Sequence, residues 1–285
     1  MASQGAGSGG RVAVVTGAAR GIGAATVLAL AEAGWSVLAV DSTADDPALP
    51  YPMAAPADLT EVVSRAEAAG RAEAAGQPGG NAGDGRVQPF VADVRDTGAV
   101  TAAVAAAERR WGGLDAAIAA AGVIAGGVPL WEVPLAQQQA VLDVNLGGVL
   151  ALARAAVPAL LRRPAPRSGR FLAVASAAAT RGLPMLAAYC AAKAGVTGLI
   201  RALAAELADS GVTANAVSPG STATPALDES ARLYGLPGAQ AFASQQPAGR
   251  LLDPAEVAAV LAFLASPASS GMTGAVVPVD GGLAL

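Results

Sequence analysis

The sequence predicts an α/β fold in which a parallel sheet is covered by helices on both faces. Short runs rich in β-branched residues alternate along the chain with longer alanine-rich stretches, and this order is typical of such sheets. The chain has 285 residues, and 53% of them are apolar. That size fits one large domain, and fits two small ones less well.

The first unit of the pattern is a strand, a helix and a second strand. Residues 11–16 (RVAVVT) are predicted to be a buried strand, and an alanine-rich helix runs over 22–33 until Gly34 ends it. Residues 35–40 (WSVLAV) are the next buried strand, which Asp41 closes. A unit of about 30 residues has the length of a βαβ crossover.

The same alternation continues to the end of the chain. Because parallel strands need crossover connections, the later helices are expected to cover the sheet. Further strands are predicted at 87–91, 114–119, 171–175, 212–217 and 275–279. The helices between them are predicted at 97–110, 137–161, 186–209 and 254–264.

Residues 42–86 interrupt this rhythm and are expected to be an insertion after the second strand. Prolines 47, 50, 52 and 56 exclude regular structure from its first part, whereas 59–75 can form a helix. The hexapeptide RAEAAG occurs twice in succession, at 65–70 and 71–76, which suggests a small duplication in a tolerant loop. Residues 77–85 are predicted to be a flexible surface loop, and residues 1–10 a disordered tail.

Composition excludes several classes of function. A net charge of −4 without a cluster of Lys and Arg argues against nucleic acid as a partner. The absence of histidine removes histidine-based catalysis and the commonest zinc ligand, so no metal is expected. A single cysteine, no signal peptide and no sufficiently long apolar run predict a cytoplasmic protein without a membrane span.

The surface is expected to carry little charge, since Asp, Glu, Lys and Arg make up only 14% of the chain. One interpretation is that further copies of the chain cover part of it. The other is that a GC-rich genome fills the surface with alanine, without any effect on assembly.

A glycine-rich turn lies between the first predicted strand and the first helix. In TGAARGIG (16–23) the glycines let the backbone turn sharply, and the helix start offers free N–H groups to a phosphate. Asp41 can bind both ribose hydroxyls of an adenosine and would repel a 2′-phosphate, which favours NAD over NADP. The alternative is that Asp41 only initiates a turn. Arg20 has two interpretations: it binds a phosphate, or it is a solvated residue of the loop.

Further along the chain, polar side chains form a candidate catalytic group. Tyr189 and Lys193 are four residues apart and share one face of a predicted helix. The ammonium, together with a nicotinamide, would lower the phenol pKa from about 10. Ser176 follows the strand 171–175, where active groups of such sheets gather, and Asn145 is a buried amide in an apolar helix. The Tyr–Lys spacing alone also fits a core tyrosine and a surface lysine.

Together these motifs resemble the short-chain dehydrogenase/reductase family. TGAARGIG (16–23), Asp93-Val94, Asn145, Ser176, YCAAK (189–193) and SPGST (218–222) follow its order and spacing within residues 11–285. The resemblance implies a single NAD-binding domain with a Rossmann-like, doubly wound sheet of seven parallel strands, usually assembled as a homotetramer. The chain departs from the family at 119–122, where AAAG replaces the frequent NNAG and removes amides that stabilise that strand.

The family also implies a role for each matching residue. Tyr189 exchanges the proton, Lys193 holds the nicotinamide ribose, Ser176 binds the substrate oxygen, and Asn145 supports a proton-relaying water chain. Hydride moves directly between cofactor and substrate carbon, so no metal is needed. The implied cofactor-binding residues are Gly17, Ala19, Arg20, Gly21, Ile22, Gly23, Asp41, Asp93, Val94, Ala121, Gly122, Asn145, Tyr189, Lys193, Pro219, Gly220, Thr222 and Thr224.

The insertion carries a narrower resemblance, to the mycofactocin-coupled members of the family. The matching segments are ADDPALPYPMAAPADL (44–59), AAAGVIAGG (119–127), PLWE (129–132) and ARLYGL (231–236). Such members hold NAD without exchange and pass electrons to mycofactocin, a peptide-derived redox carrier, so the insertion would fold over the adenine end. The alternative is an ordinary surface insertion with freely exchanging NAD(H).

The expected activity is the NAD-dependent interconversion of a hydrophobic secondary alcohol and its ketone. By analogy with the family, residues 224–249 would form a flexible substrate lid. A non-catalytic dinucleotide sensor on the same fold is the competing hypothesis, against which the intact Ser176, Tyr189 and Lys193 count. The residues that give the substrate site its apolar character are Leu183, Pro184, Met185, Leu227, Leu233, Tyr234, Leu236 and Phe242.

Overall fold

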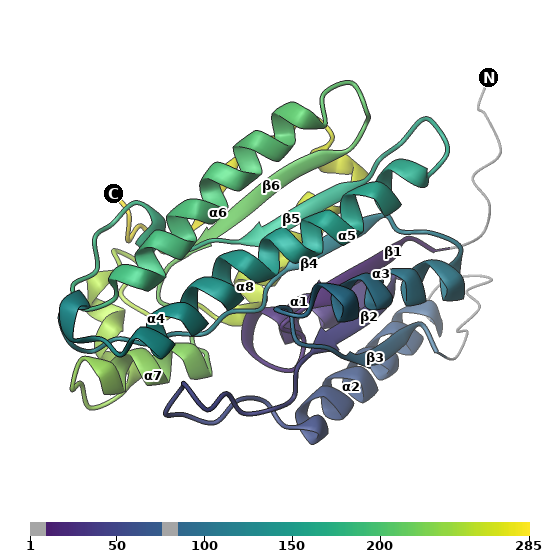
Figure 1. The fold of residues 1–285 in the computed structure, drawn as a ribbon. Helices are drawn as coiled ribbons and strands as arrows, with labels where there is room; N and C mark the ends of the chain where they lie inside the picture. Colours follow the sequence, from purple (N-terminus) through teal and green to yellow (C-terminus); the bar gives the residue numbers. More distant parts are fainter. Residues whose placement is uncertain (1–9, 76–84) are drawn as a thin grey trace.

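The computed structural model describes residues 10–75 and 85–285, and a parallel sheet forms its centre (Figure 1). Across this sheet the strands follow the order β3-β2-β1-β4-β5-β6-β7, and all neighbours are parallel. The chain reverses its direction of winding between β1 and β4, and ligands bind such sheets at the carboxyl ends of the strands there. The predicted doubly wound, Rossmann-like fold is confirmed. The strands are β1 (Val12–Thr16), β2 (Ser36–Asp41), β3 (Val87–Val91), β4 (Ala116–Ala119), β5 (Arg170–Val174), β6 (Thr213–Pro219) and β7 (Val276–Val279).

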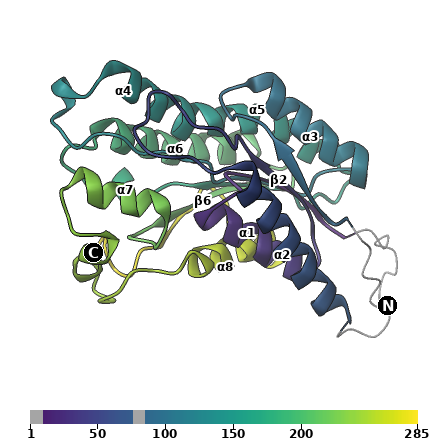
Figure 2. The same ribbon diagram turned by 90° about the horizontal axis from the view of Figure 1, so that it is seen from below.

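Helices cover both faces of the sheet (Figure 2). One layer contains α3, α5 and α6, and the other contains α1, α2 and α8. The helices are α1 (Gly21–Glu32), α2 (Pro56–Ala75), α3 (Thr97–Trp111), α4 (Leu135–Leu142), α5 (Gly148–Arg162), α6 (Ala187–Glu206), α7 (Pro225–Leu233) and α8 (Pro254–Ala265).

Each face of the sheet has its own apolar core. In β1, Val12 and Val14 pack against the layer that contains α3, α5 and α6, whereas Ala13 and Val15 pack against the opposite layer. This alternation follows from the two-residue period of a strand. Every residue of β1 is buried, as expected of a strand covered on both sides.

A long helix connects β4 to β5. Helices α4 and α5 are continuous through a π-helical segment, Asp143–Gly147, so together they occupy Leu135–Arg162, close to the predicted 137–161. Its length and hydropathy would allow it to cross a membrane, but 61% of its most apolar window is buried inside the protein. That burial is what the core helix of a folded domain shows.

The insertion differs in two ways from the expectation. Pro56 begins helix α2 instead of preventing it, because proline is tolerated in the first turn, where its missing N–H costs no hydrogen bond. The predicted helix over 59–75 is confirmed, and the RAEAAG repeat lies in this helix as far as Ala75, so the suggestion that the duplication arose in a loop does not fit. The predicted tail 1–10 and loop 77–85 lie outside the described residues, except for Gly10 and Gly85.

Candidate active site

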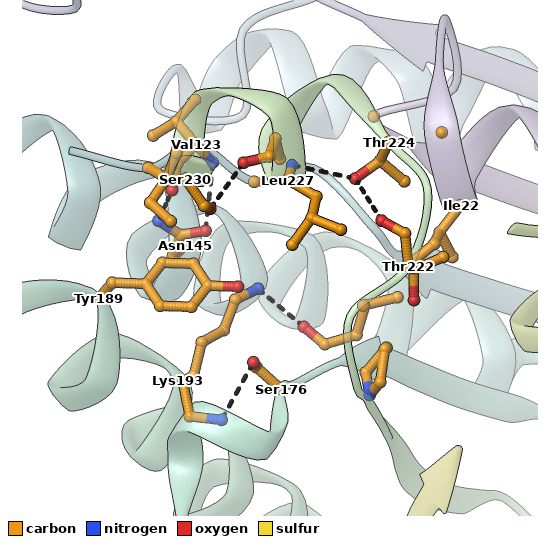
Figure 3. A pocket seen from close by; sticks show the side chains of 18 of the residues that line it. Ile22, Val123, Asn145, Ser176, Tyr189, Lys193, Thr222, Thr224, Leu227 and Ser230 are labelled. Atoms are coloured by element: carbon orange, nitrogen blue, oxygen red, sulfur yellow. Dashed lines mark hydrogen bonds between the residues drawn. The ribbon is translucent and has the colours of Figure 1, made fainter. Parts of the chain in front are cut away.

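A cavity of about 640 Å³ at the carboxyl ends of the strands collects the predicted site residues (Figure 3). All residues predicted for catalysis or cofactor binding line this cavity except Ala19. Ala19 is a buried residue of the glycine turn, and its N–H donates to Asp41 Oδ2 over 3.0 Å. The structure therefore brings together residues that are far apart in the sequence.

The glycine turn forms one end of the cavity, and two of its glycines have no room for a side chain. Gly17 has a φ of +67°, and a Cβ there would lie 2.5 Å from Ala121 Cα. A Cβ on Gly23 would lie 2.0 Å from the carbonyl oxygen of Gly17. Helix α1 starts here without a side-chain cap, so its first N–H groups can bind an anion.

Asp41 makes the local turn considered for it and also lies at the cavity. Its Oδ2 accepts the N–H of Ala19, and its Oδ1 accepts the N–H of Thr43 over 3.3 Å, which forms a local turn. The carboxylate also lines the cavity. Because two carboxylate oxygens offer about four acceptor positions, Asp41 can still bind ribose hydroxyls.

The first part of the insertion, residues 42–55, contributes part of the cavity lining and is called the strap below. Arg20 donates to the carbonyl oxygen of Pro52 over 3.0 Å, which ties the glycine turn to the strap. Further along, Tyr51 Oη accepts the N–H of Ile124 over 2.9 Å. The strap residues that line the cavity are Ser42, Ala44, Asp46, Met53 and Ala54.

A chain of charges joins the strap to the loop after β3. Arg95 forms ion pairs with Asp46 (2.7 Å) and Asp93 (2.6 Å), and all three side chains line the cavity. Burial opposes ionisation of Asp93, but the hydrogen bonds from Arg95 outweigh it and lower the pKa of this carboxyl. Asp93 is therefore a charged acceptor at the same end of the cavity as Asp41.

The candidate catalytic residues lie on α6 and just after β5. Lys193 is buried, donates to the carbonyl oxygen of Val174 over 2.9 Å, and its Nζ lies 5.7 Å from the centre of the Tyr189 ring. Ser176 caps a short 3₁₀ turn, with its Oγ accepting the N–H of Ala178. Figure 3 shows Ser176, Tyr189 and Lys193 converging on one part of the cavity.

Burial dominates the titration of this group. It lowers the pKa of Lys193 to about 8. It also raises the pKa of Tyr189, and the hydrogen bond from Ser176 opposes that rise without cancelling it. Burial thus raises the phenol pKa in the protein without a cofactor, and the expected lowering by Lys193 together with a bound nicotinamide stays a prediction.

Asn145 lies in the π-helical segment and is completely buried. Its Nδ2 donates to the carbonyl oxygens of Val123 and Val141, each over 2.8 Å, and its Oδ1 accepts the N–H of Val123 over 3.3 Å. The amide therefore clamps the loop after β4 to the helix behind the catalytic residues.

The departure at 119–122 leaves β4 intact. Thr16 Oγ1 lies at the end of β1 and accepts the N–H groups of Ala120 (3.3 Å) and Ala121 (3.5 Å). These bonds hold the end of β4 against β1 without side-chain amides. A Cβ on Gly122 would lie 2.9 Å from Asn145 Oδ1, so this glycine allows the clamp to form.

The segment after β6 closes the far side of the cavity. Thr224 caps helix α7 by accepting the N–H of Leu227, and its hydroxyl donates to the carbonyl oxygen of Thr222 over 3.3 Å. Figure 3 shows Thr222 and Thr224 beside Ile22 of the glycine turn. Helix α7 and a 3₁₀ helix, Ala239–Gln245, lie within the segment 224–249, where the sequence predicted only a lid.

Most of the residues predicted to make the substrate site apolar line this cavity. The exceptions are Met185 and Leu233, and Leu233 instead lines a smaller hollow nearby. Arg181 and Leu283 were not predicted to line the cavity, and for the strap only its general place over the adenine end was expected, because contacts between distant segments leave no local pattern in the sequence. The residues that do line it are Leu183, Pro184, Leu227, Tyr234, Leu236 and Phe242.

Comparisons with known proteins agree with this geometry. A family model described as Enoyl-(Acyl carrier protein) reductase matches residues 60–284, and one described as short chain dehydrogenase matches 11–51. Cis-4-hydroxycyclohexanecarboxylate dehydrogenase of Sinomonas cyclohexanicum is 37% identical, with 95% of this chain and 96% of that protein covered. D-threitol dehydrogenase of Mycolicibacterium smegmatis is 35% identical, with 96% and 92% covered.

Solved structures show the same similarity over the whole chain. Carveol dehydrogenase from Mycobacterium avium, in complex with NAD, has a TM-score of 0.85 and 33% identity, with 97% of this chain and 98% of that chain covered. A short chain dehydrogenase from Mycobacterium paratuberculosis bound to NAD has a TM-score of 0.80 and 31% identity, with the same coverage. The fold, the cavity and these relatives define an NAD-dependent oxidoreductase that acts on CH–OH groups. The chain belongs to the short-chain dehydrogenase/reductase family.

Proposed function

We propose that the protein interconverts a hydrophobic secondary alcohol and its ketone by hydride transfer with NAD. The observation that carries this proposal is the single cavity, which joins Asp41 and the glycine turn at one end to Ser176 and Tyr189 at the other. Apolar side chains line the remaining wall. The alcohols named for two relatives, carveol and cis-4-hydroxycyclohexanecarboxylate, support this class of substrate.

In the proposed mechanism, Tyr189 exchanges a proton with the substrate oxygen, and Ser176 donates a hydrogen bond to the same oxygen. The raised pKa of Tyr189 suits a proton donor to a carbonyl. Lys193 holds the nicotinamide ribose and supplies positive charge beside the phenol, while Asn145 supports the path by which the proton leaves. Bound NAD supplies or accepts the hydride.

The cofactor-binding residues named in the sequence analysis form the proposed dinucleotide site. The N–H groups at the start of α1 fit the pyrophosphate, and Asp41 fits the adenosine ribose. Asp93 and Val94 fit the adenine, and Pro219, Gly220, Thr222 and Thr224 fit the nicotinamide end. No metal has a part in this mechanism.

We further propose that NAD stays bound through the catalytic cycle and that mycofactocin reoxidises it. The support is the strap, which borders the adenine end and is attached on both sides of the cavity, through Arg20 to Pro52 and through Tyr51 to Ile124. An ordinary enzyme with freely exchanging NAD(H) is the alternative. We also propose a cytoplasmic location and assembly as a homotetramer.

Replacement of Tyr189 by Phe tests the mechanism and the sensor hypothesis together. Oxidation of cyclic secondary alcohols, followed with a dye as electron acceptor, should fall by a factor of about 10² to 10⁴, the usual contribution of a general acid–base group. NAD content should stay at the wild-type level. Retained turnover in Tyr189→Phe would refute the assigned role, and a wild type that binds NAD but oxidises no alcohol would favour the sensor.

Extraction of the purified protein tests the trapped cofactor. Protein prepared without added dinucleotide is dialysed extensively and denatured, and the supernatant is assayed for NAD and NADH. Near-stoichiometric NAD(H) is expected. A protein that is purified without bound dinucleotide and takes up NAD reversibly would show free exchange. That result would refute the mycofactocin proposal.

A further inference from the structure

The substrate half of the cavity carries one charged side chain outside the catalytic group. The carboxylates that line the cavity, Asp41, Asp46 and Asp93, all lie near the dinucleotide end. Among the residues the structure describes, Arg181 is the cation that lines the other end together with the apolar wall. A cation in this position, on a chain with a net charge of −4, indicates a local preference for an anion.

Two sets of contacts fix Arg181 relative to the catalytic serine. Its backbone N–H donates to the carbonyl oxygen of Ala177 over 3.0 Å, in the turn that follows Ser176. Its side-chain Nη1 donates to the carbonyl oxygen of Leu283, a residue that also lines the cavity. These contacts hold Arg181 at the cavity wall, in the segment that follows the catalytic serine.

The turn that holds Leu283 is itself well ordered by hydrogen bonds. The Oδ1 of Asp280 accepts the N–H of Gly282, and its Oδ2 accepts the N–H of Ala284, each over 3.0 Å. The backbone of Asp280 also accepts the N–H of Leu283. The partner of Arg181 is thus a fixed carbonyl, and this contact uses only one of the five guanidinium N–H groups.

The other N–H groups of Arg181 have no carboxylate partner in the described part of the chain. The side chain is exposed at the cavity wall, so a ligand can reach it. A planar guanidinium binds a carboxylate through two parallel hydrogen bonds, an arrangement that a neutral amide or ester cannot match.

We propose that the natural substrate is an acidic alcohol or ketone, whose carboxylate pairs with Arg181 while its reacting carbon lies at Ser176 and Tyr189. The apolar wall between these two points fits a hydrocarbon ring or chain. This inference rests on the proposed function, since it assigns a further group to the same substrate.

A binding experiment tests the inference independently of turnover. Titration calorimetry on the NAD-saturated protein compares cyclohexanecarboxylate with cyclohexanecarboxamide, for the wild type, Arg181→Gln and the control Arg201→Gln. Arg201 is an exposed arginine of α6 that does not line the cavity. The wild type and Arg201→Gln should bind the acid about 10 to 100 times more tightly than the amide, and Arg181→Gln should lose that preference.

Kinetics with a matched substrate pair complete the test. For cis-4-hydroxycyclohexanecarboxylate and its methyl ester, Arg181→Gln should raise KM for the acid about 10-fold or more and change kcat/KM for the ester less than about twofold. Equal losses for both compounds, or a wild type that binds acid and amide equally, overturn the inference and leave the proposed function standing. If the enzyme turns over neither these two compounds nor neutral secondary alcohols, that result counts against the proposed function. The calorimetry still decides the role of Arg181 in that case.

Discussion

At the level of single residues, the active site is shaped by how burial acts on its titratable groups. Burial lowers the pKa of Lys193 to about 8 and raises that of Tyr51, in the strap, to about 12. The pKa of Tyr189 is raised for the same reason. The folded protein thus favours neutral phenols, and its buried lysine loses its proton at a lower pH than an exposed one would.

The lowered pKa of Lys193 predicts how stability changes with pH. An unfolded lysine keeps its proton up to about pH 10.4, so between pH 8 and 10 the unfolded state binds more protons and stability rises with pH. The variant Lys193→Met has no titrating group at this position, so its stability lacks this pH-dependent contribution. The difference in unfolding free energy, wild type minus variant, should therefore rise by up to about 1.4 kcal/mol per pH unit.

Urea unfolding at pH 7, 8, 9 and 10 measures this difference. Measurements stop at pH 10, because the unfolded lysine itself begins to lose its proton above that pH. The raised tyrosine pKa values affect the stability of both proteins, so their contribution cancels in the difference. A difference that stays flat across the series would show that Lys193 titrates normally in the folded protein.

At the level of elements, the strap is an irregular segment that lines the cavity. It has no regular structure, so its path is set by its attachments to the glycine turn, the loop after β3 and the loop after β4. The ion pair between Asp46 and Arg95 is the charged attachment, and the Asp46 side chain is only 9% exposed.

Removal of this ion pair should speed the loss of NAD. Asp46→Asn keeps the size of the side chain but weakens its bond to Arg95, so we expect dissociation of NAD to accelerate several-fold, as befits a partly buried pair worth about 1 kcal/mol. Glu61→Gln is the matched control, since it breaks an exposed pair with Arg65 on α2. Retention is followed by dialysis and dinucleotide assay. Equal retention in both variants would mean that this ion pair does not help the strap to hold NAD.

The elements also show what sequence can and cannot predict here. The strands were predictable because a strand buried on both faces must be an apolar run, and the glycine turn because Gly17 and Gly23 have no room for a Cβ. The path of the strap could not be predicted, since Ile124 and Tyr51, which form one of its hydrogen bonds, are 73 positions apart in the sequence. Helix α7 was not predicted, although Thr224 and Pro225 form a typical helix start.

At the level of the whole molecule, large apolar side chains remain exposed on both helix layers. Leu150 of α5 and Phe263 of α8 are each 47% exposed, and they belong to opposite layers. In a homotetramer two different surfaces of each copy are covered, which gives such residues a partner.

Charged substitutions at these positions test the assembly. Leu150→Glu and Phe263→Glu should each convert a tetramer into dimers, because each places a charge in one of two interfaces, and sedimentation velocity reports the mass. Val91→Glu serves as the control, since Val91 is exposed on the edge strand β3, away from α5 and α8. A monomeric wild type, or tetramers in both variants, would refute the proposal.

The two hydrogen bonds of Asp41 bear on attempts to redesign the enzyme as an NADP-dependent biocatalyst. The usual strategy replaces the acidic residue with a small or basic one to admit a 2′-phosphate. Here that exchange would also leave the N–H groups of Ala19 and Thr43 without their acceptor. The ribose contact proposed for Asp41 and the shape of the glycine turn therefore depend on the same carboxylate, and an engineer who changes one must rebuild support for the other.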